Sequence, residues 1–233
     1  QLASINADGS LDAWNTDSAV NDSRMGQSIV MWRNYIYEIG GCAGQDASTG
    51  ECTTALNSIN YGAINQDGEA STVDTSVANG TGTCQGTAPY NCNLPPIGAG
   101  TGQIGQILNA TAIMNGYLYV IGGCSATSGD PCNSTSSNTA YAAISSTSSL
   151  TAPASCTADG NTLVGAWCVD STHTIGSGIA AAGTAIFNGR IYVVGGFNTG
   201  TNIYYNLINS DGSINSWSSV DLSSIGARNV LTY

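Results

Sequence analysis

The sequence predicts an all-β fold made of four-stranded antiparallel sheets, without a long helix, and two recurring motifs carry this prediction. The first motif is an apolar run that ends in Gly-Gly. It reads NYIYEIGG, GYLYVIGG and GRIYVVGG at residues 34–41, 116–123 and 189–196. The second motif reads INADGSLDAW at residues 5–14 and INSDGSINSW at residues 208–217. Motifs that recur at intervals of this length indicate structural repeats.

Each Gly-Gly motif is predicted to be the second strand of a hairpin. In two copies Asn-Gly precedes the apolar run, at Asn115-Gly116 and Asn188-Gly189, and another apolar run precedes the Asn-Gly. Asn-Gly between two apolar runs is the strongest short signal for a tight hairpin. The segments TAIMNGYLYVIGG and TAIFNGRIYVVGG therefore read as strand, turn, strand.

The second motif predicts the outer hairpin of each repeat. Alignment on its isoleucine gives four copies, which begin at Ile5, Ile64, Ile144 and Ile208. Asp-Gly supplies the turn in the first, second and fourth copies, and Thr147-Ser148 replaces it in the third. The motif ends in a tryptophan, Trp14 in the first copy and Trp217 in the last, which we expect to pack on the neighbouring repeat. In the two degenerate copies Val73 and Pro153 hold that position.

Two successive hairpins make a four-stranded meander, and its second strand is apolar at almost every position, as in YLYVI. A sheet with one face in water would alternate apolar and polar residues. Burial on both faces is typical of sheets that stack radially on one another, as in a β-propeller.

On these motifs the chain resembles the kelch-type β-propeller repeat. The residues that carry the resemblance are the Gly-Gly pairs, the tyrosine that follows each of them and the last tryptophan, namely Gly40-Gly41, Gly122-Gly123, Gly195-Gly196, Tyr61, Tyr141, Tyr205 and Trp217. More narrowly, it resembles kelch-like arrays with an I-N-x-D-G-S-x-x-x-W hairpin in predicted surface proteins of bacteria. The Tyr-to-Trp gap is longer here than in ordinary kelch repeats.

The repeat units divide the whole chain, residues 1–233, as a segment of a larger propeller. We expect a half blade at residues 1–20, three blades, and the start of a further blade. The blades span residues 21–76, 104–155 and 180–222, and the further blade starts at residues 227–233.

The composition excludes several function classes. Only 8% of the residues are charged, lysine is absent, and the net charge is -11, so the chain lacks the basic footprint of a nucleic-acid-binding protein. No apolar run reaches the roughly 18 residues that span a membrane.

His173 is the sole histidine and no G-x-S-x-G elbow is present, so a loop histidine is expected rather than a catalytic triad. Galactose oxidase, which has a kelch-type fold, needs two histidines for its copper. We therefore predict no enzyme, cofactor or metal site.

The eight cysteines lie among Asn, Ser, Thr and Gly, which favours disulfides and a secreted or cell-surface location. The repeat selects four sequence-local bridges, each of which closes a long loop: Cys42–Cys52, Cys84–Cys92, Cys124–Cys132 and Cys156–Cys168. Four N-x-S/T sequons are possible glycosylation sites, at Asn21, Asn79, Asn109 and Asn133.

The long loops are predicted to project from one face of the propeller, which we call the long-loop face. They are the second turns and the links between blades, at residues 42–60, 77–103, 124–140 and 154–178. Long loops on a rigid scaffold often carry function. Tyr90 and Trp167 are the aromatic binding candidates on this face. Glu38, which replaces an apolar residue of the inner strands, is either a structural polar contact at the central channel or a ligand contact.

The predicted function is an extracellular binding or adhesion module whose partner is a protein or glycan on a cell surface. A structural subunit of an extracellular filament, sheath or surface layer, which would bind further copies of itself, is the alternative. A carbohydrate-active enzyme with its site in other blades is the third possibility.

Overall fold

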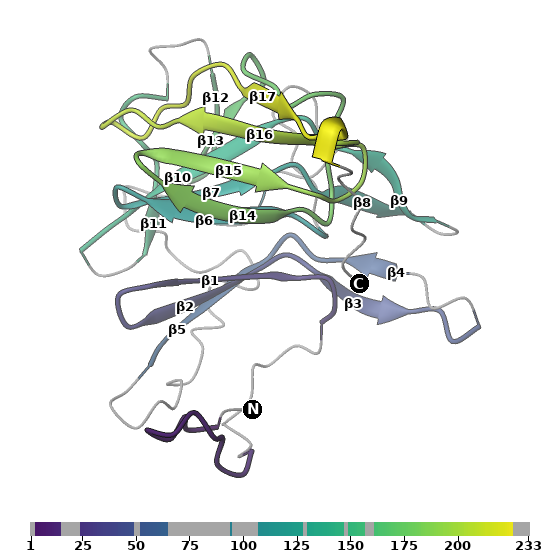
Figure 1. Cartoon of the computed structure of the whole chain (residues 1–233), viewed down its shortest axis with the longest axis vertical. Helices are drawn as coiled ribbons and strands as arrows, with labels where there is room; N and C mark the ends of the chain where they lie inside the picture. Colours follow the sequence, from purple (N-terminus) through teal and green to yellow (C-terminus); the bar gives the residue numbers. More distant parts are fainter. Residues whose placement is uncertain are drawn as a thin grey trace.

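The computed structural model describes residues 3–14, 24–48, 52–64, 94, 107–127, 130–146, 149–156 and 161–225. Within these ranges the fold is all-β, with antiparallel sheets and one short 3-10 turn, η2 (Ser223–Ile225), as the predicted fold class requires. Three sheets follow one another along the chain and are stacked in that order (Figure 1). None of the described segments forms a helix of the length and hydropathy needed to cross a membrane.

The first sheet has the order β1-β2-β5, from β1 (Ser28–Trp32), β2 (Tyr35–Ile39) and β5 (Ile59–Ala63). Between β2 and β5 the chain leaves the sheet as a separate hairpin, formed by β3 (Cys42–Gln45) and β4 (Cys52–Ala55).

The central sheet begins with β6 (Ala110–Met114), β7 (Tyr117–Ile121) and β10 (Thr139–Ile144), and a second hairpin, β8 (Cys124–Thr127) with β9 (Asp130–Thr135), leaves it between β7 and β10. The outer edge of β10 pairs with two separate pieces of chain. The short β11 (Leu150–Thr151) covers one end of β10, and β13 (Trp167–Asp170) covers the other, with β12 (Thr162–Val164) beyond it.

The last sheet is the four-stranded meander that the motifs predict. Its strands β14 (Gly183–Phe187), β15 (Arg190–Val194), β16 (Asn202–Leu207) and β17 (Ser218–Asp221) pair in sequence order. The predicted Asn-Gly turns are also present. Asn115 and Asn188 have φ of 54° and 47°, and the glycines after them have φ of 80° and 73°, as a tight two-residue hairpin turn requires.

The register of the central sheet corrects one sequence alignment. Tyr205 of β16 pairs with Ser218, and the equivalent Tyr141 of β10 pairs with Cys168. The residue before Ser218 is Trp217, so the corresponding tryptophan of the central sheet is Trp167 and not Pro153. The chain inserts a segment after β11 and only then returns to complete the edge of the sheet. Spacing in the sequence could not reveal this, because strand pairing tolerates an insertion that lies outside the ladder.

The three sheets are held together by two apolar cores. In each sheet we call the face toward the next sheet the leading face and the opposite face the trailing face. In the last sheet the leading face is the one turned away from the central sheet. The leading face of the first sheet, with Tyr37 and Ile59, packs on the trailing face of the central sheet, with Leu118 and Val120. The leading face of the central sheet packs in the same way on the last sheet, through residues such as Tyr119, Tyr141, Ile191 and Val193. Burial on both faces of the central sheet explains why its second strand is continuously apolar.

A pair of tyrosines occupies the same place on every leading face. The pairs are Tyr37–Tyr61, Tyr119–Tyr141 and Tyr192–Tyr205, with ring centroids 5.7, 5.9 and 5.9 Å apart. The first two pairs lie in the cores between sheets.

Candidate functional site

Two disulfide-closed hairpins project side by side from one end of the stacked sheets (Figure 1). The β3–β4 hairpin is closed by Cys42–Cys52 and the β8–β9 hairpin by Cys124–Cys132. β4 contacts both β8 and β9, so the two hairpins form one surface, which we call the stapled rim. At the same place the last sheet has only the short connection between β15 and β16, residues 195–201.

The stapled rim rests on an apolar base. Cys42, Cys52 and Cys124 are buried together with Ile107 and Ala180, and Phe197 of the last sheet packs against them. Above this base, Ala43, Gln45, Thr53 and Thr54 are exposed. The hairpins are thus anchored by their disulfides, and the exposed positions on β3 and β4 carry uncharged side chains.

The third described bridge, Cys156–Cys168, is present but does not belong to the stapled rim. It closes the insertion between β11 and β13, at the end of the sheets where the tight turns lie. There the Ser155 hydroxyl donates a hydrogen bond to the carbonyl oxygen of Asp211, in the turn of the outer hairpin of the last sheet (3.0 Å). The expectation that all of residues 154–178 lies on the long-loop face is therefore wrong, because the extra residues enter before the outermost strand and not after it.

The prediction that Trp167 is an exposed binding residue is also wrong. Its side chain is fully buried, at 0% exposure, in the core between the first and central sheets. The sequence predicts a loop at this residue because two glycine-rich segments flank it, but in the structure Trp167 is the first residue of β13 and belongs to the sheet.

Glu38 has a structural role. One of its carboxylate oxygens lies 3.5 Å from Nε of Arg24 and accepts a hydrogen bond from the Asn60 side chain (3.1 Å). The Arg24 guanidinium in turn donates to the carbonyl oxygen of Gly40 (2.8 Å). This network stabilises the Gly-Gly corner of the first sheet, which agrees with a structural polar contact rather than a ligand site.

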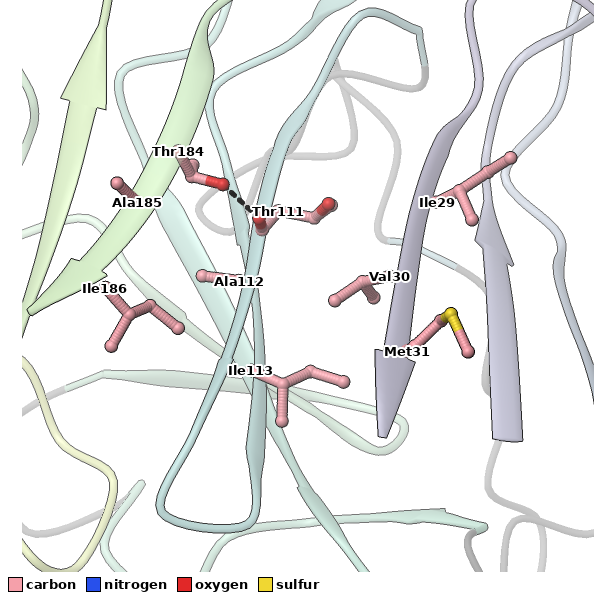
Figure 2. A pocket seen from close by; sticks show the side chains of 9 residues that line it. All are labelled: Ile29, Val30, Met31, Thr111, Ala112, Ile113, Thr184, Ala185 and Ile186. Atoms are coloured by element: carbon pink, nitrogen blue, oxygen red, sulfur yellow. Dashed lines mark hydrogen bonds between the residues drawn. The ribbon is translucent and has the colours of Figure 1, made fainter. Parts of the chain in front are cut away.

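An open cleft of about 390 Å³ runs between the first strands of the three sheets (Figure 2). It is lined by three consecutive residues from each of β1, β6 and β14, at positions 29–31, 111–113 and 184–186. Two threonines are the polar lining residues, and the Thr184 hydroxyl donates to the Thr111 carbonyl oxygen (2.6 Å). Apart from these two hydroxyls, the side chains that line the cleft are apolar.

His173 and Asp170 form a local turn. The Asp170 carboxylate accepts the backbone N–H groups of Thr172 and His173 and lies 2.8 Å from Nδ1 of His173. These contacts satisfy the hydrogen-bonding capacity of the buried Asp170 carboxylate at the end of β13. In the described part of the chain, no three His, Cys, Asp or Glu side chains are grouped closely enough to hold a metal ion.

One sequon is unsuitable for glycosylation in the folded chain. Asn109 is 5% exposed and lies directly before β6, where its carbonyl oxygen accepts a hydrogen bond from the Ser28 hydroxyl. Asn133 lies in β9. The remaining sequence candidates, Asn21, Asn79, Tyr90 and the Cys84–Cys92 bridge, lie outside the described residues.

Tyr119 holds the outer hairpin of the last sheet in place, a contact that the sequence motifs did not predict. In the hairpin that begins at Ile208, the Gly212 carbonyl oxygen accepts a hydrogen bond from Tyr119 of the central sheet (2.8 Å). Burial raises the pKa of the Tyr119 phenol, so the hydroxyl stays a donor. A hydrogen bond from the Ser213 hydroxyl lowers the pKa of the neighbouring Asp211. The tyrosine that recurs in each Gly-Gly motif was the available signal for this contact.

No protein-family model matches the chain, and no curated protein matches it. Among the solved structures that match is one titled "Structure of YjhT". It is 12% identical to the chain, with a TM-score of 0.49, and the match covers 94% of this chain and 51% of that structure. The chain thus spans about half the length of that protein. A likeness at this level assigns neither a family nor an activity.

Removal of one rim disulfide should destabilise the fold measurably. Cys42 and Cys52 are 10 positions apart, and a bridge over a loop of this size restricts the unfolded chain by about 2–3 kcal/mol. We expect the double variant Cys42→Ser/Cys52→Ser to lose about that much free energy of unfolding in urea titrations. The matched variant Cys124→Ser/Cys132→Ser, with a separation of 8, should lose a similar amount. Unchanged unfolding midpoints in both variants would show that the bridges do not constrain the chain.

Proposed function

We propose that the chain is part of a kelch-like β-propeller that acts outside the cell as a binding or adhesion module, and that the stapled rim is its contact surface. The single observation that carries this proposal is the pairing of two disulfide-closed hairpins at one end of the stacked sheets. The three disulfides of the described residues are typical of secreted or extracellular proteins.

The propeller form is supported by the way in which successive sheets pack. Each sheet covers the leading face of the sheet before it, and their innermost strands β1, β6 and β14 lie next to one another around the cleft. Repetition of this step around an axis generates a propeller.

The stapled rim suits binding for a physical reason. Ordering flexible loops on a partner costs conformational entropy, and crosslinks that order them beforehand reduce this cost. Both hairpins are closed by disulfides and anchored on one apolar base. The exposed positions of β3 and β4 carry no positive charge, which favours a protein or glycan partner over a nucleic acid.

A loop exchange within the fold tests the proposal. The last sheet carries its own short version of the rim, so residues 42–55 are replaced by residues 197–201, with the same exchange for residues 124–135. Native and exchanged chains are labelled and applied to an array of immobilised glycans and extracellular-matrix proteins. We expect the native chain to bind a subset of spots and the exchanged chain to lose them.

Met31→Ser is the matched control for this experiment. Met31 is 57% exposed and lies at the opposite end of the first sheet, beside the β1–β2 turn. The control should keep the native binding pattern. If the exchanged chain still binds every spot of the array that the native chain binds, or if Met31→Ser loses them, the stapled rim is not the contact surface.

A further inference from the structure

The described disulfides differ in burial. In the Cys124–Cys132 bridge of the stapled rim, Cys124 is 0% exposed but Cys132 is only partly buried. The cysteines of the other two described bridges are at most 4% exposed. Cys132 is therefore the one bridged cysteine among the described residues that the fold leaves partly open to solvent.

Burial decides how fast a thiol can reduce a bridge. Thiol–disulfide exchange begins when a thiolate attacks one sulfur, so its rate depends on access to that sulfur. Both cysteines of Cys42–Cys52 lie in the apolar base of the rim, and both cysteines of Cys156–Cys168 lie in the core between the central and last sheets. A charged thiolate reaches such sulfurs only after a local opening of the fold. At Cys124–Cys132 one sulfur belongs to a residue that is already partly exposed.

The exposure of Cys132 is set by neighbours that the structure already describes. Cys132 belongs to β9, which has β4 of the first sheet on one side. On the other side Asn198 of the last sheet donates a side-chain hydrogen bond to the Thr135 hydroxyl (3.3 Å). The last sheet has only residues 195–201 at the place where the first two sheets carry a hairpin, so β9 is covered less than β4 is. Sheets added at either end of the stack would lie beyond these neighbours.

We propose that Cys124–Cys132 is a redox-sensitive bridge, which a low-molecular-weight thiol reduces selectively. Reduction opens the β8–β9 half of the stapled rim, while Cys42–Cys52 keeps the β3–β4 half closed. The inference rests on the proposed function in one respect: if the stapled rim is the contact surface, reducing conditions weaken binding to the partner.

The exchange proceeds in two steps. The incoming thiolate forms a bond to Sγ of Cys132, the bond between the two cysteine sulfurs breaks, and the Cys124 sulfur leaves as a thiolate that takes a proton from water. A second thiolate then attacks the sulfur of the first thiol in this mixed disulfide, and Cys132 leaves as a thiolate and is protonated. Two thiols are thus oxidised to one disulfide, and the bridge is reduced to two thiols.

The β8–β9 hairpin depends on its bridge more than a regular sheet would. Its two strands form a sheet of their own, with a register shift between Ser125 and Thr127. A separate two-stranded hairpin is marginally stable in water. Cys124 remains attached without the bridge, because its N–H and carbonyl groups form hydrogen bonds with Ile107 (2.9 and 3.1 Å). Opening is therefore confined to the part of the hairpin beyond Cys124.

The order of reduction is tested by trapping thiols in the whole native chain. Reduced glutathione is added in graded amounts, free thiols are alkylated with iodoacetamide, and chymotryptic peptides are analysed by mass spectrometry. We expect Cys124 and Cys132 to be alkylated about tenfold faster than Cys42 and Cys52. The mixed disulfide with glutathione should form on Cys132. Equal rates for the two bridges, or glutathione bound to Cys124 instead, would overturn the proposal.

Hydrogen–deuterium exchange measures the opening of the hairpin without any partner. After mild reduction the amides of β8 and β9 should exchange faster, while those of β3, β4 and β7 stay protected. Cys124→Ser/Cys132→Ser should show the same pattern without reductant. The matched variant Cys156→Ser/Cys168→Ser lacks the bridge at the other end of the sheets and should keep native protection in β8 and β9. Unchanged protection of β8 and β9 in the reduced chain would contradict the opening.

Binding is measured last, on the array of glycans and matrix proteins. Mild reduction should remove the spots that the native chain binds, and oxidised glutathione should restore them. Spots that persist while β8 and β9 are open would show that the bridge does not regulate the contact. If the native chain binds no spot, the proposed function fails, whereas the alkylation order and the hydrogen exchange still decide whether the bridge is redox-sensitive.

Discussion

Trp167→Ala should lower the free energy of unfolding by about 3–5 kcal/mol, the usual result of truncating a buried aromatic side chain. Trp167 is 0% exposed and is the largest fully buried side chain described. It packs with Tyr37 and Leu94 in the core between the first and central sheets. Its loss would leave a cavity at the edge of the central sheet, where an inserted segment already interrupts the outer strand.

Trp14→Ala is the matched control for this prediction. Trp14 holds the equivalent place in the N-terminal copy of the motif but is 63% exposed, so its truncation should change stability in the isolated chain by less than about 0.5 kcal/mol. Urea unfolding followed by circular dichroism measures both variants. Equal effects of the two substitutions would contradict the assignment of Trp167 to the core.

Gly196→Ala should be destabilising by about 2–5 kcal/mol, as the sum of backbone strain and overpacking. Gly196 has φ of 84°, a region that residues with a Cβ seldom adopt. An added Cβ would also lie closer than 3.0 Å to the Ala180 carbonyl oxygen and would meet the Ala182 nitrogen at 2.8 Å. These are backbone atoms of the segment that enters the last sheet, so they cannot move aside as a side chain would.

Gly116→Ala separates the two causes. Gly116 has nearly the same φ, 80°, but its Cβ position has no atom within 4 Å. This variant should show only the cost of backbone strain, about 1–2 kcal/mol. A Gly116→Ala loss as large as that of Gly196→Ala would mean that close approach of the backbones is not the reason for the Gly-Gly motif.

The sequence by itself determined the local structure of this protein. Asn115-Gly116 and Asn188-Gly189 make tight turns because asparagine and glycine tolerate positive φ. The hairpin bridges Cys42–Cys52 and Cys124–Cys132 also followed from the sequence, since cysteines that flank one repeat loop lie close in the folded repeat. The repeated motifs likewise indicated sheets that pack face to face, because both faces of YLYVI are apolar.

Only the tertiary structure decided which residues meet across sheets. The Trp167 slot, the side of the fold on which Cys156–Cys168 lies and the pairing of Glu38 with Arg24 all depend on strand register and on contacts between distant segments. Spacing along the chain does not report them, because an insertion outside the hydrogen-bonded ladder shifts the sequence without shifting the sheet. The unequal burial of the two I-N-x-D-G-S hairpins has the same origin: identical local structure is covered at Ile208 and exposed at Ile5, according to what packs against it.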